Sequence, residues 1–358
     1  MFNITVKKAS SAELKSKPAP GSALGFGKIL TDHMFLMDYQ EGKGWHSPRI
    51  EPYRPFMMDP ATLVLHYGQE VFEGMKAYRW QNGEVCLFRP RVNYERLNRS
   101  ARRLCMPEIS VDDAMEATRQ LVRIEKDWIP SEAGTSLYIR PNMIATEVAL
   151  GVHVSTKFVF YIIVGPVGAY YPQGFNPTDI YVSEKYTRAA TGGLGEAKTM
   201  ANYAASLLAQ KEAHDLGYTQ VLWLDAVERK YIEEVGTSNI FFVIGDELIT
   251  PSLTGTILPG ITRDSVIHMA RDWGVNVSER KISLEEVLSA AENRTLKEVF
   301  ASGTAAVISP VGKLAYRGKT QVVNHGKVGP LSQRLYDSIM GIQYGKVKDP
   351  YGWIEKVM

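Results

Sequence analysis

The sequence has few of the features that mark secreted, metal-binding or membrane proteins. Only two of its 358 residues are cysteines, Cys86 and Cys105, and they stand in unrelated contexts. They make neither a disulfide framework nor a metal site, and this scarcity fits a reducing compartment. A helix needs about 20 apolar residues to span a bilayer. The most apolar run, residues 158–171, is shorter and is interrupted by Gly165 and Pro166.

Charge and N-terminal pattern exclude further classes. The formal net charge is only +2, which gives no support to a general nucleic-acid or polybasic membrane role. The N-terminus lacks the pattern of a secretory signal and the arginine-rich pattern of a transit peptide. No histidine or cysteine cluster has zinc-like spacing. The sequence therefore predicts a cytoplasmic protein without a metal and without nucleic-acid or membrane partners.

The length predicts two domains, because single cores stop growing at about 250–300 residues. We place an N-terminal, smaller domain at residues 1–167, with a polar lead-in at 1–27. An interdomain loop dense in glycine, proline and aromatic residues follows at 168–179, and a C-terminal domain covers 180–358. Strands occur in hairpins with helices in between, so the predicted class is α+β rather than a Rossmann-type alternation.

The coarse pattern predicts the main elements of both halves. Residues 62–80 are strand-like and continue through Asn82-Gly83, a pair typical of a type I′ turn, into a hairpin. Alternating and apolar runs predict strands at 136–144, 157–167 and 180–184, and hairpins at 220–235 and 238–251. Residues 299–311 predict a strand and a tight glycine turn. Helices are predicted at about 90–104, 111–127, 262–274, 283–293 and 330–340, with Ser283 and Glu286 in a capping-box pattern.

One lysine stands out from this pattern. In "TGGLGEAKTMANYAASLLAQKEA", Lys198 lies after a glycine-rich turn, among small residues, at the start of a predicted helix. A cation there meets the positive end of the helix dipole, which is mildly unfavourable. A solvated surface lysine is the default interpretation. A phosphate-binding loop is the second, but Ala197 stands where that motif has glycine and no strand runs directly into the loop.

The third interpretation is a Schiff-base lysine. Desolvation or nearby positive charge lowers the pKa of an amine and makes it nucleophilic. If pyridoxal 5′-phosphate (PLP) is the partner, a carboxylate must face its pyridine nitrogen, a hydroxyl must reach its 3-oxygen, and donors must hold its phosphate.

The sequence offers candidates for the ring contacts. Glu233 and Glu234 lie in an apolar hairpin strand, where alternation predicts that one points inward and one outward. Two exposed charges are the plain alternative. Tyr203 supplies a phenol near the start of the same helix as Lys198, and its plain alternative is a core tyrosine.

Two turns offer donors for the phosphate. Ile261 and Thr262 open a helix behind a Pro-Gly turn, and Thr304 lies in the glycine turn of "ASGTAAV". Each taken alone is an ordinary turn or helix start. Spacing leaves six arginines open as the phosphate cation: Arg89, Arg91, Arg96, Arg99, Arg102 and Arg103.

Several segments of the chain, taken together, resemble a known family. The segments "EAKTMANYAASLLAQKEA", "QVLWLD", "EEVGTSNIFF", "ILPGITR" and "SGTAAV" are similar, in order and spacing, to the fold-type IV PLP enzymes. The match is best to branched-chain amino acid aminotransferases and extends through "HYGQEVFEGMKAYRW" and "PVGAYYPQGF", from about Gly27 to Gly345. The resemblance implies two α/β domains with the active site between them, a homodimer, and ping-pong transamination through a Lys198 aldimine. The implied donors are Leu, Ile and Val, and 2-oxoglutarate is the implied acceptor, which becomes L-glutamate.

The resemblance also assigns cofactor contacts. It implies that Lys198 forms the internal aldimine and moves the proton, and that Glu234 pairs with the pyridine nitrogen. Tyr203 matches the phenol at the 3-oxygen, and Arg96 matches the phosphate arginine that spacing left open. The remaining implied cofactor contacts are Thr237, Leu258, Ile261, Thr262 and Thr304.

Substrate contacts follow from the same resemblance. The implied pocket consists of Tyr67, Phe72, Tyr138, Tyr170 and Thr237, with the substrate carboxylate near Thr304, Ala305 and Ala306. Arg140 is expected to help accept the acidic co-substrate, and Leu150 and Val152 match a loop that reaches the second subunit. Animal members carry a Cys-x-x-Cys pair where this chain has Ala306 to Ser309, so thiol regulation is not expected.

Three alternatives remain beside this interpretation. Other fold-type IV enzymes, a D-amino acid aminotransferase or an aminodeoxychorismate lyase, share the C-terminal motifs but have shorter chains and fit the N-terminal motifs poorly. A non-catalytic PLP carrier would have the same cofactor contacts. A phosphate-loop protein is disfavoured by Ala197.

Overall fold

The computed structural model describes residues 3–168 and 174–358, which divide into two units, each with its own sheet and core. Unit 1 comprises Met1–Tyr170, Ala197–Met200 and Gly341–Met358, and unit 2 comprises Tyr171–Glu196 and Ala201–Met340. The C-terminal segment groups with unit 1 because β18 (Ile354–Lys356) pairs with β6 (Val85–Phe88). The two units therefore differ from the predicted sequence ranges at this segment and at the short segment that carries Lys198.

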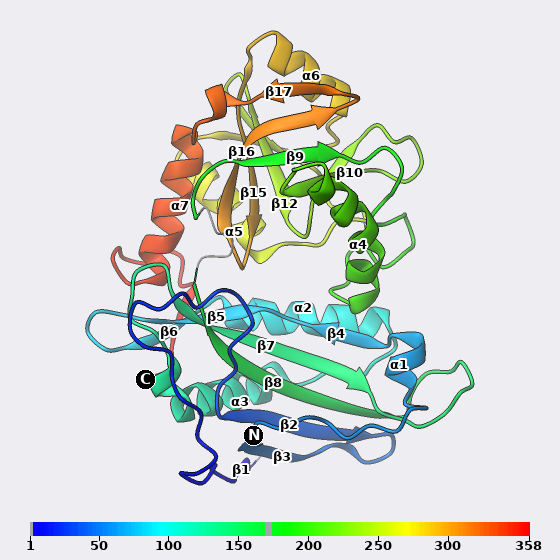
Figure 1. Cartoon of the computed structure of the whole chain (residues 1–358), viewed down its shortest axis with the longest axis vertical. Helices are drawn as coiled ribbons and strands as arrows, with labels where there is room; N and C mark the ends of the chain where they lie inside the picture. Colours follow the sequence, from blue (N-terminus) through cyan, green and yellow to red (C-terminus); the bar gives the residue numbers. More distant parts are fainter. Residues whose placement is uncertain (1–2, 169–173) are drawn as a thin grey trace. The chain divides into compact units, whose positions relative to one another are not determined.

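Unit 1 is built on one sheet with two helices packed against it (Figure 1). The strand order is β1-β3-β2-β8-β7-β5-β6-β18, and β4 also pairs with β7. Neighbouring strands are antiparallel except β1 and β3. The bounds are β1 Thr5–Val6, β2 His33–Gln40, β3 Gly44–Pro52, β4 Glu70–Phe72, β5 Met75–Arg79, β7 Ser136–Ala145 and β8 Lys157–Val167, with helices α1 Leu63–Tyr67, α2 Pro90–Arg103, α3 Val111–Ile124 and η1 Lys126–Trp128.

The core of unit 1 explains why α2 and α3 form where the sequence predicts them. Tyr94, Leu97 and Ala101 recur at helical spacing on α2, and all three are buried. Leu121 on α3 joins the same core. The apolar stripe of each helix therefore faces the sheet, and α2 and α3 also contact each other.

Two details of unit 1 differ from the sequence prediction. Residues 62–80 are not all extended, because Leu63–Tyr67 form the short helix α1. The hairpin of β5 and β6 is present, but the type I′ turn is wrong. Gly83 has φ 85°, whereas Asn82 is not in the left-handed region that a type I′ turn needs at both central residues.

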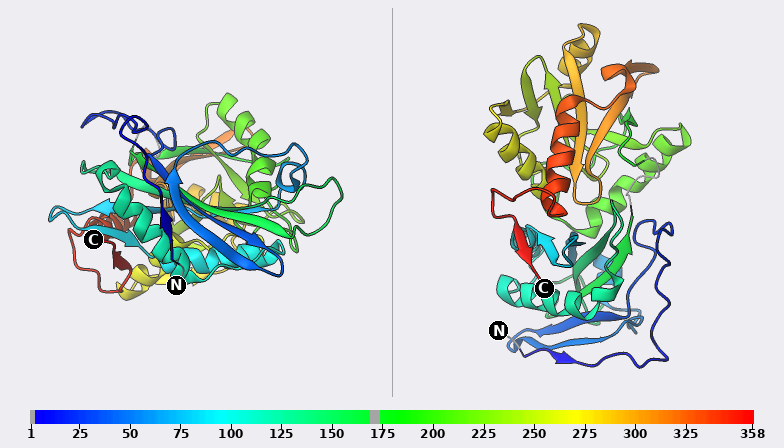
Figure 2. Two further views of the ribbon diagram at one scale, coloured as in Figure 1. Left: turned by 90° about the horizontal axis from the view of Figure 1, so that it is seen from below. Right: turned by 90° about the vertical axis from the view of Figure 1, so that its left-hand side faces the viewer.

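Unit 2 has a mixed sheet in the order β11-β10-β9-β16-β15-β12-β13-β14, with β17 pairing with β16. Figure 1 labels β9, β10, β12, β15, β16 and β17 of this sheet, and Figure 2 shows the unit from two further sides. Its parallel pairs are β9–β10, β9–β16 and β13–β14. The strands are β9 Thr178–Val182, β10 Gln220–Leu224, β11 Ile232–Val235, β12 Asn239–Ile244, β13 Glu247–Thr250, β14 Asn276–Glu279, β15 Leu296–Gly303, β16 Val307–Tyr316 and β17 Lys319–Val322. The helices are α4 Met200–Asp215, α5 Ile261–Asp272, α6 Leu284–Glu292, η2 Asn324–Gly326 and α7 Pro330–Gln343.

The predicted hairpins and helices of this half are confirmed, and so is the α+β class. β10–β11 and β12–β13 are antiparallel pairs. At α6 the Ser283 hydroxyl accepts from the Glu286 amide at 3.0 Å, which is one half of the predicted capping box. The Glu286 carboxylate binds Arg280 at 2.6 Å. Within the described ranges, no helix has the length and apolar character needed to cross a membrane.

Candidate active site

Backbone and side-chain contacts within unit 1 fix the chain on both sides of Lys198. The Lys198 amide donates to the Ser100 hydroxyl at 2.9 Å, and its carbonyl accepts from the Phe72 amide at 3.1 Å. At the start of α4, the Met200 amide donates to a carboxylate oxygen of Glu70 at 2.7 Å. A carboxylate at a helix N-terminus binds a free amide and complements the dipole. Glu70, which sequence reasoning missed, therefore offsets the unfavourable position of the lysine.

Glu70 is also electrostatically linked to two predicted site residues. Burial raises the pKa of Glu70, while hydrogen bonds from Met200 and Asn142 and the positive charges of Arg140 and Lys198 act in the opposite direction. The Asn142 amide donates to Glu70 at 2.7 Å. Lys198 is half-buried rather than fully solvated. The interpretation as an ordinary surface lysine does not fit this environment.

Four predicted residues meet in one cluster around Phe72. The Lys198 Nζ atom lies 4.8 Å from the centroid of the Phe72 ring, and the Arg140 guanidinium lies 4.6 Å from the same centroid. Arg140 also lies 5.3 Å from the Tyr138 ring centroid and donates to the Tyr138 hydroxyl at 3.0 Å. Lysine, aromatic rings and a second cation thus surround one region of unit 1.

Arg96 differs from the other candidate arginines because it is buried. Its Nε and Nη2 atoms donate to the two carboxylate oxygens of Glu73 at 2.7 and 2.9 Å. The two side chains are only 4% and 0% exposed. Glu73 also accepts from the Gly74 amide at 3.1 Å. Glu73 was not predicted, because its local sequence does not indicate that it binds an arginine of α2.

The remaining predicted residues of unit 1 lie on α1 and on the loop after β7. The Tyr67 hydroxyl donates to the Leu150 carbonyl, so these two residues are brought together. Leu150 and Val152 have exposed side chains. Tyr170 lies outside the described residues. The predicted contact of this loop with a second subunit stays a prediction.

In unit 2, Glu234 on β11 is a buried carboxylate with partners at both oxygens. Its Oε1 accepts from the Leu258 amide and from the Asn239 side-chain amide, each at 3.1 Å. Its Oε2 forms a close ion pair with the Nε of Arg188. The Arg188 and Glu234 side chains are 8% and 4% exposed. Arg188 and Asn239 were both missed from the sequence.

The predicted exposure of one of the two glutamates, Glu233 or Glu234, is wrong, because both side chains are buried. Glu233 accepts a hydrogen bond from the Thr256 hydroxyl at 2.5 Å, so the segment around Thr256 covers the side of β11 that was expected to face solvent. Burial raises the pKa of Glu233, while the Thr256 hydrogen bond opposes the rise.

Asn239 connects the carboxylate to the start of α5. Its side-chain amide donates to the Leu258 carbonyl at 2.9 Å as well as to Glu234. A Cβ on Gly260 would overlap the Asn239 side-chain oxygen, so the chain can pass this close only with glycine there. Gly260 is the N-cap residue of α5 and provides no side-chain cap. The amides of the first turn, which includes Ile261 and Thr262, point out of the helix and favour an anion.

Two tight turns lie side by side near this helix start. One contains Thr237, which is exposed, and the other is formed by Thr304, Ala305 and Ala306. The pairing of Asn239 with Ser302 brings the two turns together. Val307, the first residue after the second turn, has φ 64°, a strained conformation for a β-branched residue. Such strain concentrates at ligand sites.

Tyr203 lies in the first turn of α4 and is half-buried. Its predicted contact with the cofactor oxygen stays a prediction. The described part of the chain contains no group of three or more histidine, cysteine, aspartate or glutamate side chains able to hold a metal ion.

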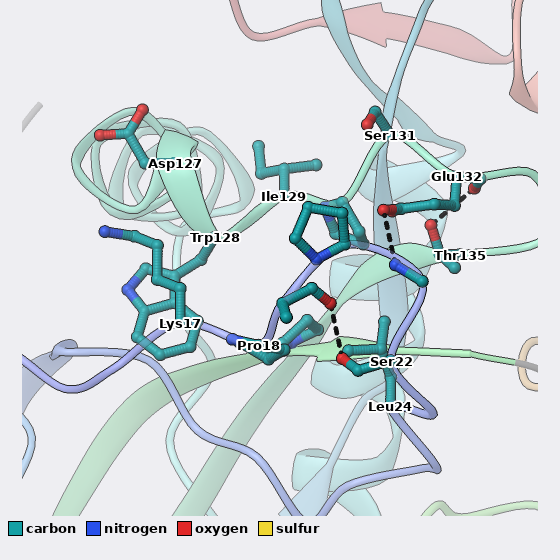
Figure 3. A pocket seen from close by; sticks show the side chains of 15 residues that line it. Lys17, Pro18, Ser22, Leu24, Asp127, Trp128, Ile129, Ser131, Glu132 and Thr135 are labelled. Atoms are coloured by element: carbon teal, nitrogen blue, oxygen red, sulfur yellow. Dashed lines mark hydrogen bonds between the residues drawn. The ribbon is translucent and has the colours of Figure 1, made fainter.

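A cavity of about 310 Å³ lies elsewhere in unit 1, where the N-terminal lead-in crosses the segment after α3 (Figure 3). It is lined by residues 17–22 and 24, residues 127–132, Thr135 and Pro166, and by none of the predicted site residues that the structure describes. The Gly21 amide donates to Glu132 at 3.3 Å, which helps to fasten the lead-in there. This cavity is therefore separate from the predicted site residues that the structure describes.

Comparison with known proteins identifies the family of the chain that carries these clusters. The model of the amino-transferase class IV family matches residues 70–314, a range that contains Lys198, Arg188 and Glu234. The chain belongs to the class IV aminotransferase family and is an enzyme of the transferase class.

Individual relatives are similar over nearly the whole chain. The branched-chain-amino-acid transaminase 1 of Bacillus subtilis (strain 168) is 54% identical over 357 residues, 99% of this chain and 100% of the relative. A probable branched-chain-amino-acid aminotransferase of Staphylococcus epidermidis is 52% identical, with 97% of each chain covered. The crystal structure of the Escherichia coli branched-chain amino acid aminotransferase matches with TM-score 0.76 at 31% identity, covering 90% of this chain and 99% of that one. The Thermobaculum terrenum branched-chain amino acid aminotransferase, solved in its PLP form, matches with TM-score 0.72 at 27% identity, covering 90% and 98%.

Proposed function

We propose that this enzyme is a PLP-dependent aminotransferase that moves the amino group of Leu, Ile and Val onto 2-oxoglutarate. The structural observation that carries the proposal is the buried Glu234 carboxylate, paired with Arg188 and adjoining the start of α5 through Asn239. The names of the relatives support the substrate class.

The residues present fit PLP. The Glu234 carboxylate provides the partner for a protonated pyridine nitrogen, and Tyr203 provides the phenol for the 3-oxygen. The uncapped first turn of α5 provides amides for a phosphate, and Arg96 provides a buried cation. Lys198, Ile261, Thr262, Thr304, Thr237 and Leu258 would complete the contacts. When bound, PLP supplies an electron sink that weakens the Cα–H bond of an amino acid.

The side chains divide the work around this cofactor. The Lys198 Nζ removes a proton from the substrate Cα and later returns one, and its fixed backbone limits how far the amine can move. Glu234 remains ionised and holds the pyridine proton in place. The strained turn at Thr304, Ala305 and Ala306 offers amides to the substrate carboxylate.

The substrate pocket must accept an aliphatic chain in one half-reaction and a carboxylate in the other. Tyr67, Phe72 and Tyr138 provide aromatic surface for the aliphatic chain. Arg140, stacked on Phe72 and bonded to Tyr138, brings a cation to the same surface for the second carboxylate of 2-oxoglutarate. One methylene changes selectivity in an apolar pocket only about 10–200-fold, so all three branched amino acids should react. Leu150 and Val152 would contact the second subunit of a homodimer.

A donor panel tests the proposal. The PLP-loaded protein should convert L-Leu, L-Ile and L-Val with 2-oxoglutarate to glutamate by ping-pong kinetics, with L-Met and L-Phe as weaker donors. Lys198→Ala should abolish turnover, whereas Lys185→Ala, at an exposed lysine of unit 2, should leave turnover unchanged. Activity with D-alanine but not L-Leu would select the D-amino acid alternative. Undiminished turnover in Lys198→Ala would refute the role of the lysine.

A further inference from the structure

Arg188 is a buried arginine to which the sequence pattern assigns no role. It lies before the glycine-rich turn, in a segment without helix or strand. Its Nη2 atom donates to the carbonyls of Gly195 and Thr256 at 2.8 and 2.9 Å. Its Nε atom faces the Oε2 of Glu234. The two backbone carbonyls hold the guanidinium in place, and its charge is directed at one carboxylate.

Among the contacts of Glu234 described above, the one with Arg188 is the one that brings a positive charge. The Leu258 amide and the Asn239 side chain, which donate to its other oxygen, are neutral groups. Glu233, the adjacent acidic residue, is buried as well and adds no positive charge. Burial disfavours an ionised carboxylate, and an adjacent cation within a few ångströms reverses that preference.

We propose that Arg188 is a positioning residue that keeps Glu234 ionised and thereby keeps the cofactor's pyridine nitrogen protonated. The inference rests on the proposed function, because it needs PLP as the ligand. In this role Arg188 acts through Glu234 rather than on the reacting atoms. Its bond to the Gly195 carbonyl also fastens the glycine-rich segment that precedes Lys198 in the chain.

The direct readout is the protonation of the ring nitrogen in the loaded protein. Apoprotein is reconstituted with PLP labelled with ¹⁵N in the ring, and the ¹⁵N chemical shift is measured by NMR. The wild-type protein should show a protonated nitrogen. Arg188→Gln and Arg188→Met, which remove the charge with and without retained donors, should both move the signal to the unprotonated position. Arg188→Lys, which restores a cation, should move it back towards the wild-type value.

A matched control separates charge loss from general damage. Arg280→Met breaks another arginine–glutamate pair of unit 2, with Glu286, and should leave the ¹⁵N shift at the wild-type value. A second readout compares apoprotein affinity for PLP with that for an analogue whose ring nitrogen is replaced by CH. Wild type should prefer PLP, and the neutral Arg188 variants should lose that preference.

The outcomes distinguish this inference from the proposed function. Failure of the wild-type protein to bind PLP would refute the proposed function. PLP bound to wild type with an unprotonated nitrogen, or a protonated nitrogen in a folded neutral Arg188 variant, would overturn the inference alone. If neither neutral variant folds, Arg188→Lys decides. Arg188→Lys keeps the cation, so this variant should show a protonated ring nitrogen and should still prefer PLP to the analogue. Loss of both in Arg188→Lys would contradict the role of the charge.

Discussion

Each unit contains a buried arginine–glutamate pair, and the two pairs are built differently. In unit 1 the guanidinium of Arg96 binds both oxygens of Glu73 in a closed fork. In unit 2 the Nε atom of Arg188 faces the Oε2 of Glu234, and its Nη2 atom binds backbone carbonyls. The second oxygen of Glu234 accepts from Leu258 and Asn239.

The difference indicates which partner of each pair does the chemical work. In the closed fork, Glu73 fixes the direction of a cation that is proposed to hold phosphate. In the open pair, Arg188 and Asn239 fix the direction of a carboxylate that is proposed to hold a pyridine proton. A buried pair adds little net stability over an apolar replacement, but removal of one partner leaves a costly unpaired charge. The pairs therefore tell more about positioning than about stability.

The largest loss of stability is expected when the buried pair of Arg96 and Glu73 is broken. Glu73→Gln leaves the buried Arg96 charge without its carboxylate and should lower the free energy of unfolding by about 3–5 kcal/mol, measured by urea denaturation. The matched control is Glu108→Gln, which breaks the exposed pair with Arg102 and should cost at most about 1 kcal/mol. Equal losses in the two variants would contradict the distinction between buried and exposed pairs.

A smaller loss of stability is expected at Asn239, which binds Glu234 through an uncharged side-chain amide. Asn239→Ala removes one donor to Glu234 and one to the Leu258 carbonyl, and should cost about 1–3 kcal/mol in the same urea measurement. Asn82→Ala, at an exposed turn residue that accepts from the Glu84 amide, provides the comparison and should cost less. A loss no greater than that of the control would show that Asn239 does not brace the carboxylate.

The smallest effect is expected at Glu233, whose pKa burial raises above the ordinary 4.5. Between the ordinary and the raised pKa, the folded protein holds a proton that the unfolded chain has released. The wild-type free energy of unfolding should therefore fall as pH rises through that interval. Glu233→Gln should make this fall smaller in a pH series of urea melts, whereas the exposed control Glu184→Gln should leave it unchanged. An unchanged pH dependence in Glu233→Gln would contradict the assignment.

Much of the architecture could be predicted because local patterns determine it. The apolar stripe of α2 and the cap at Ser283 are readable from neighbouring residues. Five-residue α1 was missed because one helical turn carries too little periodicity. The prediction that one face of β11 is exposed to solvent failed because a distant segment around Thr256 covers that face.

The residues of the candidate site also divide into those that the sequence predicted and those that it did not. Lys198 was predicted from its own segment, and Phe72, Tyr138 and Arg140 came from a resemblance in sequence. The structure brings these four together, while their roles stay predictions. Arg188, Asn239 and Glu73 were missed because their partners are set by tertiary contacts and their own segments carry no motif. The missed residues are those that position charges, which a linear pattern does not record.

Lys198 is proposed to carry the cofactor, and borohydride reduction is the most direct test of this role. The yellow, PLP-loaded protein is reduced, digested and mapped by mass spectrometry. We expect one pyridoxyl label, on the peptide that contains Lys198, and none in Lys198→Ala. A label on another lysine, or a colourless wild-type protein that takes up no PLP, would contradict the account.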